Sequence, residues 1–138
     1  MSTYTLSTIA RHMREIDICM MVTLSKRGVL NSRPMSNNGD VKYNGSSYFF
    51  TFESSQKIRD IEANPQICLN FEGKKDLYIS VSGKARLIRD KSLFEEHWLD
   101  SLIQWFPKGI ETPGMVLIHV KGNYVQYWQK DKGGKLKL

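Results

Sequence analysis

The 138-residue chain has only two cysteines, and their placement excludes common cross-links. Cys19 and Cys68 each lie inside an apolar run and are far apart in the chain, which argues against a disulfide framework or a Cys-x-x-Cys site. The three histidines show no ligand spacing with each other or with the cysteines, so no metal site is expected. We expect both cysteines to be buried free thiols.

Long apolar stretches are also missing. No run approaches the ~20 residues of a membrane-spanning helix, and the N-terminal segment lacks a basic stretch followed by an uninterrupted apolar core. No repeat, low-complexity segment or Pro/Gly/Ser-rich linker divides the chain. We therefore expect a single domain over residues 1–129, in a cytoplasmic protein that does not engage a membrane.

The composition that is present indicates a globular chain with a basic bias. Hydrophobic residues make up 41% and charged residues 25%, which excludes wholesale disorder. Twenty Lys and Arg against 14 Asp and Glu give a net charge of +6, which favours an anionic partner. Half of this excess lies in residues 130–138, which we expect to form a mobile basic tail.

Hydrophobic periodicity and turn residues predict helices at about 5–16, 54–63 and 91–103. Strands are predicted at 19–24, 29–37, 47–52, 66–72, 77–88, 115–120 and 123–128. The turn between the first two strands predicts a hairpin. Runs of strands joined in this way favour an antiparallel sheet closed as a small barrel with helices over its openings, an α+β fold that is mainly β.

The start of the predicted helix at 54–63 has an unfavourable charge pattern. Its free N–H groups and dipole make this end electropositive, so Lys57 and Arg59 are disfavoured there unless an anion offsets them. A phosphate could accept hydrogen bonds from those N–H groups and a preceding serine, while Lys57 adds charge. The alternative is a solvated lysine and arginine stabilised by Asp60 and Glu62.

A second indication of an anion site comes from Arg33 and Pro34. Proline removes a ladder donor and belongs at a strand edge, start or bulge, which leaves nearby backbone available to another partner. The guanidinium of Arg33 can hold phosphate oxygens through two parallel hydrogen bonds. The alternative is an exposed arginine on a polar edge strand.

Several short motifs follow one another in a recognisable order. They are Gly28, Ser32-Arg33-Pro34-Met35, Phe49-Phe50-Thr51, Ser55-Gln56-Lys57, Asn64-Pro65, Val81-Ser82-Gly83-Lys84-Ala85, Trp105-Phe106-Pro107 and Tyr127-Trp128. As an ordered set over residues 5–129, they resemble the general stress protein branch of the pyridoxamine phosphate oxidase-like family. The resemblance implies a six-stranded split β-barrel that binds FMN, usually as a homodimer with two flavins at the subunit interface.

The resemblance also implies roles for particular residues. Arg33 and Lys57 are expected to hold the FMN phosphate, with Ser55 and Gln56 contributing at the helix start. The backbone expected along the isoalloxazine and ribityl portion belongs to Pro34, Met35, Phe50 and Thr51. The aromatic side chains expected to approach the flavin from the partner subunit are Trp105, Phe106 and Trp128. For Phe106 and Trp128, ordinary burial is the alternative.

The chain departs from the oxidase that makes pyridoxal phosphate. That enzyme has a C-terminal Arg and His motif for its substrate phosphate, whereas this chain ends in a lysine-rich segment, so pyridoxamine phosphate oxidation is not expected. A flavin carries its own redox chemistry, so a catalytic side chain need not be visible. An FMN-dependent oxidoreductase acting on an unknown small substrate and a non-catalytic flavin buffer therefore both stay open. So does FAD, because it shares the phosphate next to the ribityl chain.

A single-stranded nucleic-acid-binding barrel is the alternative from another class. Such barrels stack bases on aromatic residues and neutralise the backbone with basic ones. Here the basic residues are spread along the chain and are not interleaved with exposed aromatics in one strand pair. Nucleic acid is therefore the less favoured partner, and flavin the favoured one.

Overall fold

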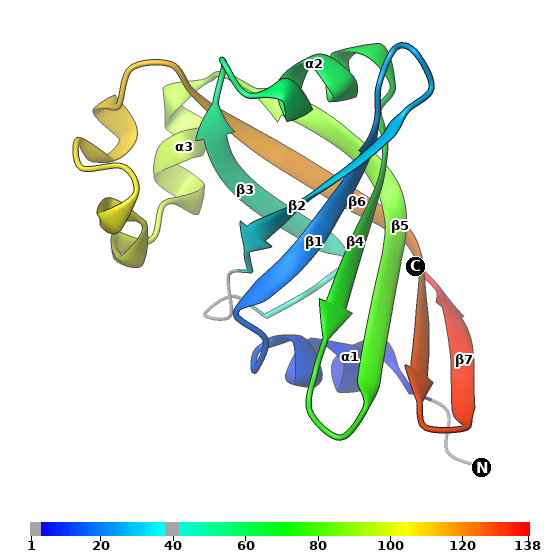
Figure 1. The fold of residues 1–138 in the computed structure, drawn as a ribbon. Helices are drawn as coiled ribbons and strands as arrows, with labels where there is room; N and C mark the ends of the chain where they lie inside the picture. The colour runs from blue at the N-terminus through cyan, green and yellow to red at the C-terminus, as the bar shows by residue number, and fades with distance from the viewer. Residues whose placement is uncertain (1–3, 38–41) are drawn as a thin grey trace.

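A computed structural model describes residues 4–37 and 42–138 (Figure 1). Its helices and strands are α1 (Leu6–Met13), β1 (Ile18–Leu24), β2 (Leu30–Ser36), β3 (Ser46–Phe52), α2 (Gln56–Ala63), β4 (Gln66–Glu72), β5 (Leu77–Ile88), α3 (Lys91–His97), β6 (Met115–Gln129) and β7 (Lys132–Lys137). Two 3₁₀ helices, η1 (Asp100–Gln104) and η2 (Gly109–Glu111), lie between α3 and β6. The predicted α+β class, mainly β, is confirmed.

The strands form one antiparallel sheet in the order β2-β1-β4-β5-β6-β3. The predicted first hairpin is confirmed as β1 and β2, and β2 lies at an end of this order, as its proline indicated. β6 pairs with β5 over most of its length, with β3 along its first half and with β7 along its second. Because β6 pairs with β3 at one end and with β7 at the other, the sheet divides along this strand. This arrangement is the split antiparallel barrel.

The barrel bends where the register between β5 and β6 shifts, between Ser82 and Gly83. A Cβ atom on Gly83 would lie 2.1 Å from the carbonyl oxygen of Lys121. Only glycine lets the two backbones approach this closely. Gly83 therefore has a role in shaping the sheet.

Alternating apolar side chains on the strands build the main core, with α1 packed against it. Ile9, Ala10 and Met13 are the buried face of α1, and the Thr5 hydroxyl caps its start by accepting a hydrogen bond from the Thr8 N–H. A second, smaller cluster lies under α3 and η1. Its buried members are Ile88, Phe94, Phe106, Met115 and Leu117.

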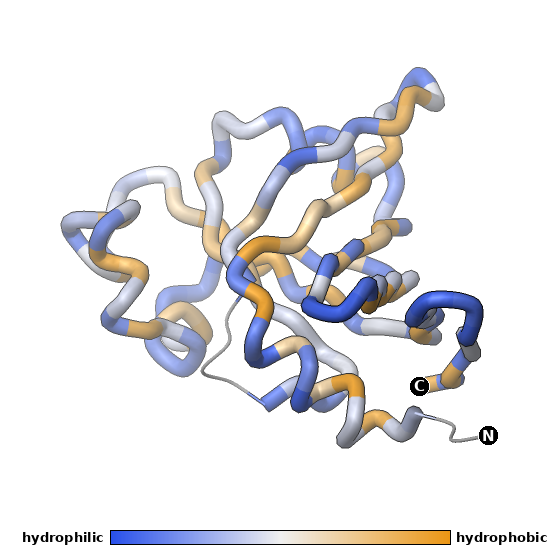
Figure 2. Tube along the Cα trace, turned by 60° about the horizontal axis from the view of Figure 1, so that its bottom comes forward, coloured by the Kyte–Doolittle hydropathy of each residue, from blue (hydrophilic) through white to orange (hydrophobic). Residues whose placement is uncertain are grey.

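The structure corrects the expectation of a mobile tail at residues 130–138. Lys132–Lys137 form β7, which pairs with β6 and gives the sheet seven strands, one more than the six implied. Gly134 lies against Tyr127, and the Lys135 Nζ lies 4.1 Å from the Tyr124 ring centroid. The mostly hydrophilic stretch before the C-terminus in Figure 2 reflects exposure, because charged residues are usual on an edge strand.

Three smaller expectations also needed correction. The predicted strands at 115–120 and 123–128 are one continuous strand, β6. The predicted helix at 91–103 ends at His97 and gives way to η1. Cys19 is a buried free thiol as expected, but Cys68 is only half-buried, because its side chain lies on the outer face of β4.

Within the described ranges, no helix is both long and apolar enough to cross a bilayer.

Candidate functional site

A cleft of about 590 Å³ lies between the sheet and the segment formed by α3 and η1. The end of β2 and residues 48–52 of β3 contribute one wall, and residues between 97 and 106 contribute the other. Seven of the residues predicted to form a site line this cleft together: Pro34, Met35, Phe50, Thr51, Lys57, Trp105 and Phe106. The predicted site residues therefore converge from four separate segments of the sequence.

One end of the cleft is aromatic. The Phe50 ring packs edge-on against Phe94, Trp98 and Phe106, with ring centroids 5.7, 5.6 and 6.2 Å away. Phe106 is only 5% exposed, so it is part of the core, whereas Trp105 is 52% exposed at the cleft. Both line the cleft of their own chain, and their expected approach to a flavin from a partner subunit stays a prediction.

Trp128 is not brought to this cleft within one chain. It lies on β6 directly opposite Tyr78 of β5, and both side chains are 45% exposed on the outer face of the sheet. This outer face also carries the exposed side chains of Ile18 and Met20. Ile18 lines both the cleft and the outer hollow that contains Trp128, so the two surfaces are continuous.

The other end of the cleft is polar and centres on Lys57. Its Nζ donates hydrogen bonds to the Thr51 Oγ1 at 3.0 Å and the Ser55 Oγ at 2.7 Å. Burial lowers the pKa of Lys57, and the charge of Arg33 lowers it further. Ser55 is the N-cap of α2, yet its side chain makes no capping bond. The lysine and the electropositive helix start are thus adjacent.

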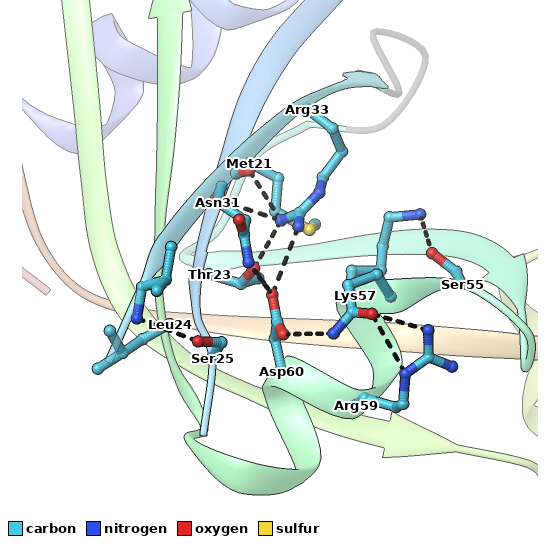
Figure 3. A network of polar contacts seen from close by, with 12 residues as sticks. Met21, Thr23, Leu24, Ser25, Asn31, Arg33, Ser55, Lys57, Arg59 and Asp60 are labelled. Atoms are coloured by element: carbon cyan, nitrogen blue, oxygen red, sulfur yellow. Dashed lines mark hydrogen bonds and ion pairs between the residues drawn. The ribbon is translucent and has the colours of Figure 1, made fainter. Parts of the chain in front are cut away.

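Arg33 is turned inward from β2 and is held in place (Figure 3). Its Nη1 donates to the Thr23 Oγ1 at 2.7 Å and to the Met21 carbonyl at 3.2 Å. Its Nη2 lies 3.6 Å from the Asp60 Oδ2, and the side chain is 19% exposed. Burial lowers the pKa of Arg33, while the Asp60 carboxylate opposes that change. An exposed arginine on a polar edge strand, the alternative from sequence, does not describe it.

Asp60 connects the hairpin of β1 and β2 to the start of α2. Its carboxylate accepts hydrogen bonds from the Thr23 hydroxyl at 2.7 Å, the Asn31 amide at 3.0 Å and the Gln56 amide at 3.1 Å. Burial alone would raise the pKa of Asp60, but these hydrogen bonds and the Arg33 charge outweigh it and lower the pKa. In the alternative drawn from the sequence, Asp60 served only to stabilise a solvated Lys57 and Arg59. The missed signal was the alternation of Asn31 and Arg33 on the inward side of β2.

The charges at this end of the cleft do not balance. Arg33 and Lys57 are both partly buried, and among the described residues Asp60 is the one carboxylate that pairs with either of them. Arg59 is exposed and donates to the Gln56 Oε1, so it joins this network through Gln56 and not through a carboxylate. One positive charge is therefore left without an acidic partner within the described part of the chain. An anion bound at the start of α2 would be that partner.

A stack of three rings at the cleft was not anticipated from the sequence. The Tyr48 ring is sandwiched between His97 and His119, with centroids 3.6 and 4.6 Å away. The His119 Nε2 lies 2.9 Å from the Ser46 Oγ. Burial lowers the pKa of His119, as do the positive charges of nearby groups, Arg86, His97 and Lys121. The three rings come from β3, α3 and β6, so no local pattern could have predicted the stack.

The fold and the cleft define the class of protein: a split antiparallel barrel with partly buried cations at one end of a cleft and aromatic side chains at the other. The family follows from comparison with known proteins. The chain belongs to the family described as pyridoxamine 5'-phosphate oxidase like, whose model matches residues 5–138.

Individual relatives agree with this assignment. General stress protein 26 of Bacillus subtilis (strain 168) is 30% identical over 78 residues, which cover 54% of this chain and 55% of the relative. The match thus spans about half the length of that curated protein. A Clostridium acetobutylicum protein related to general stress protein 26 has a similar structure, with a TM-score of 0.84 and 21% identity over 96% of this chain and 94% of that one.

A heme binding protein from Mycobacterium smegmatis also shares the fold, with a TM-score of 0.78. It is 10% identical, and the match covers 99% of this chain and 60% of that chain. Similarity at this level of identity concerns the fold alone.

Proposed function

We propose that this protein binds a flavin nucleotide, FMN, in the cleft. The observation that carries the proposal is the juxtaposition of Lys57 and Arg33, incompletely neutralised, with an aromatic-lined cleft of about 590 Å³. FMN has the matching chemistry, a phosphate monoester joined through a flexible chain to a flat, largely apolar ring system. Membership of the family and the resemblance of the site motifs support the same ligand.

The phosphate would be held at the start of α2. Lys57 and Arg33 would supply charge, the Ser55 hydroxyl and the first-turn N–H groups would supply hydrogen bonds, and Gln56 would border the site. A phosphate monoester carries about −1.5 to −2 near neutral pH, enough to neutralise the unbalanced cation. The ring system would lie along Pro34, Met35, Phe50 and Thr51, against Trp105. A flavin bound there supplies hydride and electron transfer, and the protein supplies position and electrostatics.

The proposal extends to a homodimer formed through the outer face of the sheet. Ile18, Met20, Tyr78 and Trp128 are large and exposed there, and such patches commonly mark interfaces. Because this face continues into the cleft at Ile18, a second chain could bring its Trp128 close to the flavin. Light scattering coupled to size-exclusion chromatography tests this, with Trp128→Ser expected to shift the mass toward one chain. A wild-type protein that is monomeric at micromolar concentration would rule the dimer out.

The absorbance spectrum of the purified protein tests the ligand. Bands near those of free flavin, and release of FMN on denaturation, are expected. A colourless protein that neither quenches FMN fluorescence nor melts at a higher temperature with FMN would exclude the proposal. A heme spectrum in its place would favour the activity named for the Mycobacterium smegmatis neighbour. Released FAD would correct the nucleotide and leave the phosphate site intact.

Mixing the flavin-loaded protein with NADH or NADPH in a stopped-flow instrument separates the two remaining functional classes. Rapid loss of the flavin absorbance indicates an oxidoreductase. Absorbance that persists over minutes indicates a protein that stores or carries flavin without turnover.

A further inference from the structure

The carboxylate of Asp60 is the most deeply buried charge in the described part of the chain, with 1% exposure. Burial of a lone carboxylate is costly, and such groups persist only when hydrogen bonds and an opposite charge replace water. Asp60 has both. Its Oδ2 accepts from Thr23 and Asn31 and faces Arg33, and its Oδ1 accepts from Gln56.

These partners belong to elements that must meet at the cleft. Thr23 lies on β1, Asn31 and Arg33 lie on β2, and Gln56 is the first residue of α2. The Thr23 hydroxyl accepts from the Arg33 Nη1 and donates to the Asp60 Oδ2, so it relays the position of the carboxylate to the guanidinium. One carboxylate thus fixes both the Arg33 guanidinium (Figure 3) and Gln56, the residue that begins the helix.

We propose that Asp60 is the positioning residue of the anion site, which holds Arg33 and Gln56 in place before the flavin phosphate arrives. This inference rests on the proposed function. Arg33 and Lys57 repel one another, and without Asp60 the arginine would gain by turning out to water. The Asp60 carboxylate therefore holds the Arg33 charge near the start of α2 before the anion binds. Without Asp60, the binding anion would itself have to draw Arg33 into place.

A different role for Asp60, as a simple source of negative charge, predicts the opposite change in phosphate affinity. If Asp60 were only a local negative charge, replacing it by neutral asparagine would remove repulsion and tighten phosphate binding. If it positions Arg33 and Gln56, the same change would weaken binding. Three side chains donate to Asp60, so an asparagine NH₂ would face at least one donor and break the network. The sign of the change in affinity distinguishes the two roles.

The test compares FMN with riboflavin, which has the same ring system and no phosphate. Fluorescence titration of Asp60→Asn should show FMN affinity at least 10-fold weaker than wild type, with riboflavin affinity within 2-fold. Glu62→Gln, an exposed carboxylate on the same helix, is the matched control and should change neither affinity. A purely structural defect would weaken both ligands equally, so the ratio of FMN to riboflavin affinity is the deciding quantity.

Tightened or unchanged FMN binding by folded Asp60→Asn would overturn the inference while leaving the proposed function in place. A wild-type protein that binds no FMN would overturn both. If Asp60→Asn fails to fold, as judged by its thermal melt, Thr23→Val provides the test. This variant removes the relay hydroxyl without changing any charge and should weaken FMN about 3- to 10-fold and riboflavin less than 2-fold. Equal FMN affinity in Thr23→Val and wild type would contradict the positioning role.

Discussion

At one end of the cleft Lys57, with Arg33 and Asp60 behind it, is held by directional hydrogen bonds, whereas at the other end Phe50 and Phe106 pack edge-on among further rings. The polar end depends on single atoms, because one lost acceptor leaves a buried donor or charge unpaired. The aromatic end depends on filled volume, because packing is non-directional and sums over many contacts. We therefore expect the polar end to set which ligand is bound, and the aromatic end to set stability and general affinity.

At the aromatic end, loss of a buried ring should reduce stability more than any other change considered. Phe106→Ala removes a ring that is 5% exposed and should lower the free energy of unfolding by about 3 kcal/mol or more. Urea denaturation followed by fluorescence measures it. Trp105→Ala is the neighbouring control, and because Trp105 is 52% exposed its cost should stay below about 1 kcal/mol. Equal costs would show that Phe106 does not anchor this end.

Lys57→Met tests the polar end. The loss of one charged hydrogen-bonding group, worth about 1.5–3 kcal/mol, should weaken FMN about 10- to 150-fold and leave riboflavin unchanged. Isothermal titration with both ligands measures the difference. The control is Arg59→Met, an exposed cation on the same helix that should change FMN affinity less than about 3-fold. Similar losses in both variants would indicate general electrostatic attraction and no defined phosphate site.

Trp105→Ala should give the reverse ligand pattern, with a smaller effect. Loss of one ring contact, about 0.5–1.5 kcal/mol, should weaken FMN and riboflavin alike, about 2- to 10-fold. The same titrations measure it. A loss confined to FMN would mean that the aromatic end also senses the phosphate and that the division between the two ends is wrong.

The pH dependence of stability should depend on His119, which belongs to the ring stack with Tyr48 and His97. Because the folded-state pKa of His119 lies below its usual 6.5, protonation favours the unfolded chain, so this contribution to stability is present above pH 6.5 and is lost as pH falls. Thermal melts between pH 8 and 5 should show this loss, and His119→Asn should reduce it. An unchanged pH dependence in His119→Asn would assign the loss to other groups.

The smallest effect is expected for an ion pair on the surface. Arg89 and Glu53 form an exposed pair, unlike the buried Asp60 network, and hydrogen bonding to Arg89 lowers the pKa of Glu53. Glu53→Gln should change the free energy of unfolding by less than about 0.5 kcal/mol. A cost comparable to that of Phe106→Ala in urea denaturation would show that solvent does not screen this pair as its exposure implies.

Local patterns were sufficient for most elements. The strands predicted at 66–72 and 77–88 coincide with β4 and β5, because alternation and flanking turns report a half-buried strand directly. The strand β7 was not predicted, because its lysine- and glycine-rich sequence shows little apolar alternation. It forms because it pairs with β6. The break predicted near Gly122 in β6 was wrong, because this glycine makes room for packed side chains and does not end the strand: a Cβ atom there would lie 2.8 Å from the Tyr43 hydroxyl and 3.0 Å from the Val81 Cγ1.

From the sequence alone, most helices and strands, the antiparallel class, and two cations that indicate an anion site, Arg33 and Lys57, were predicted. Three further features depend on contacts between distant segments: Asp60 is buried with Arg33, Trp105 and Phe106 share a cleft with Lys57, and Trp128 faces outward. The reason is chain closure. Thr23 and Asn31 lie 37 and 29 positions from Asp60, and periodicity within one element cannot report which distant side chains will meet.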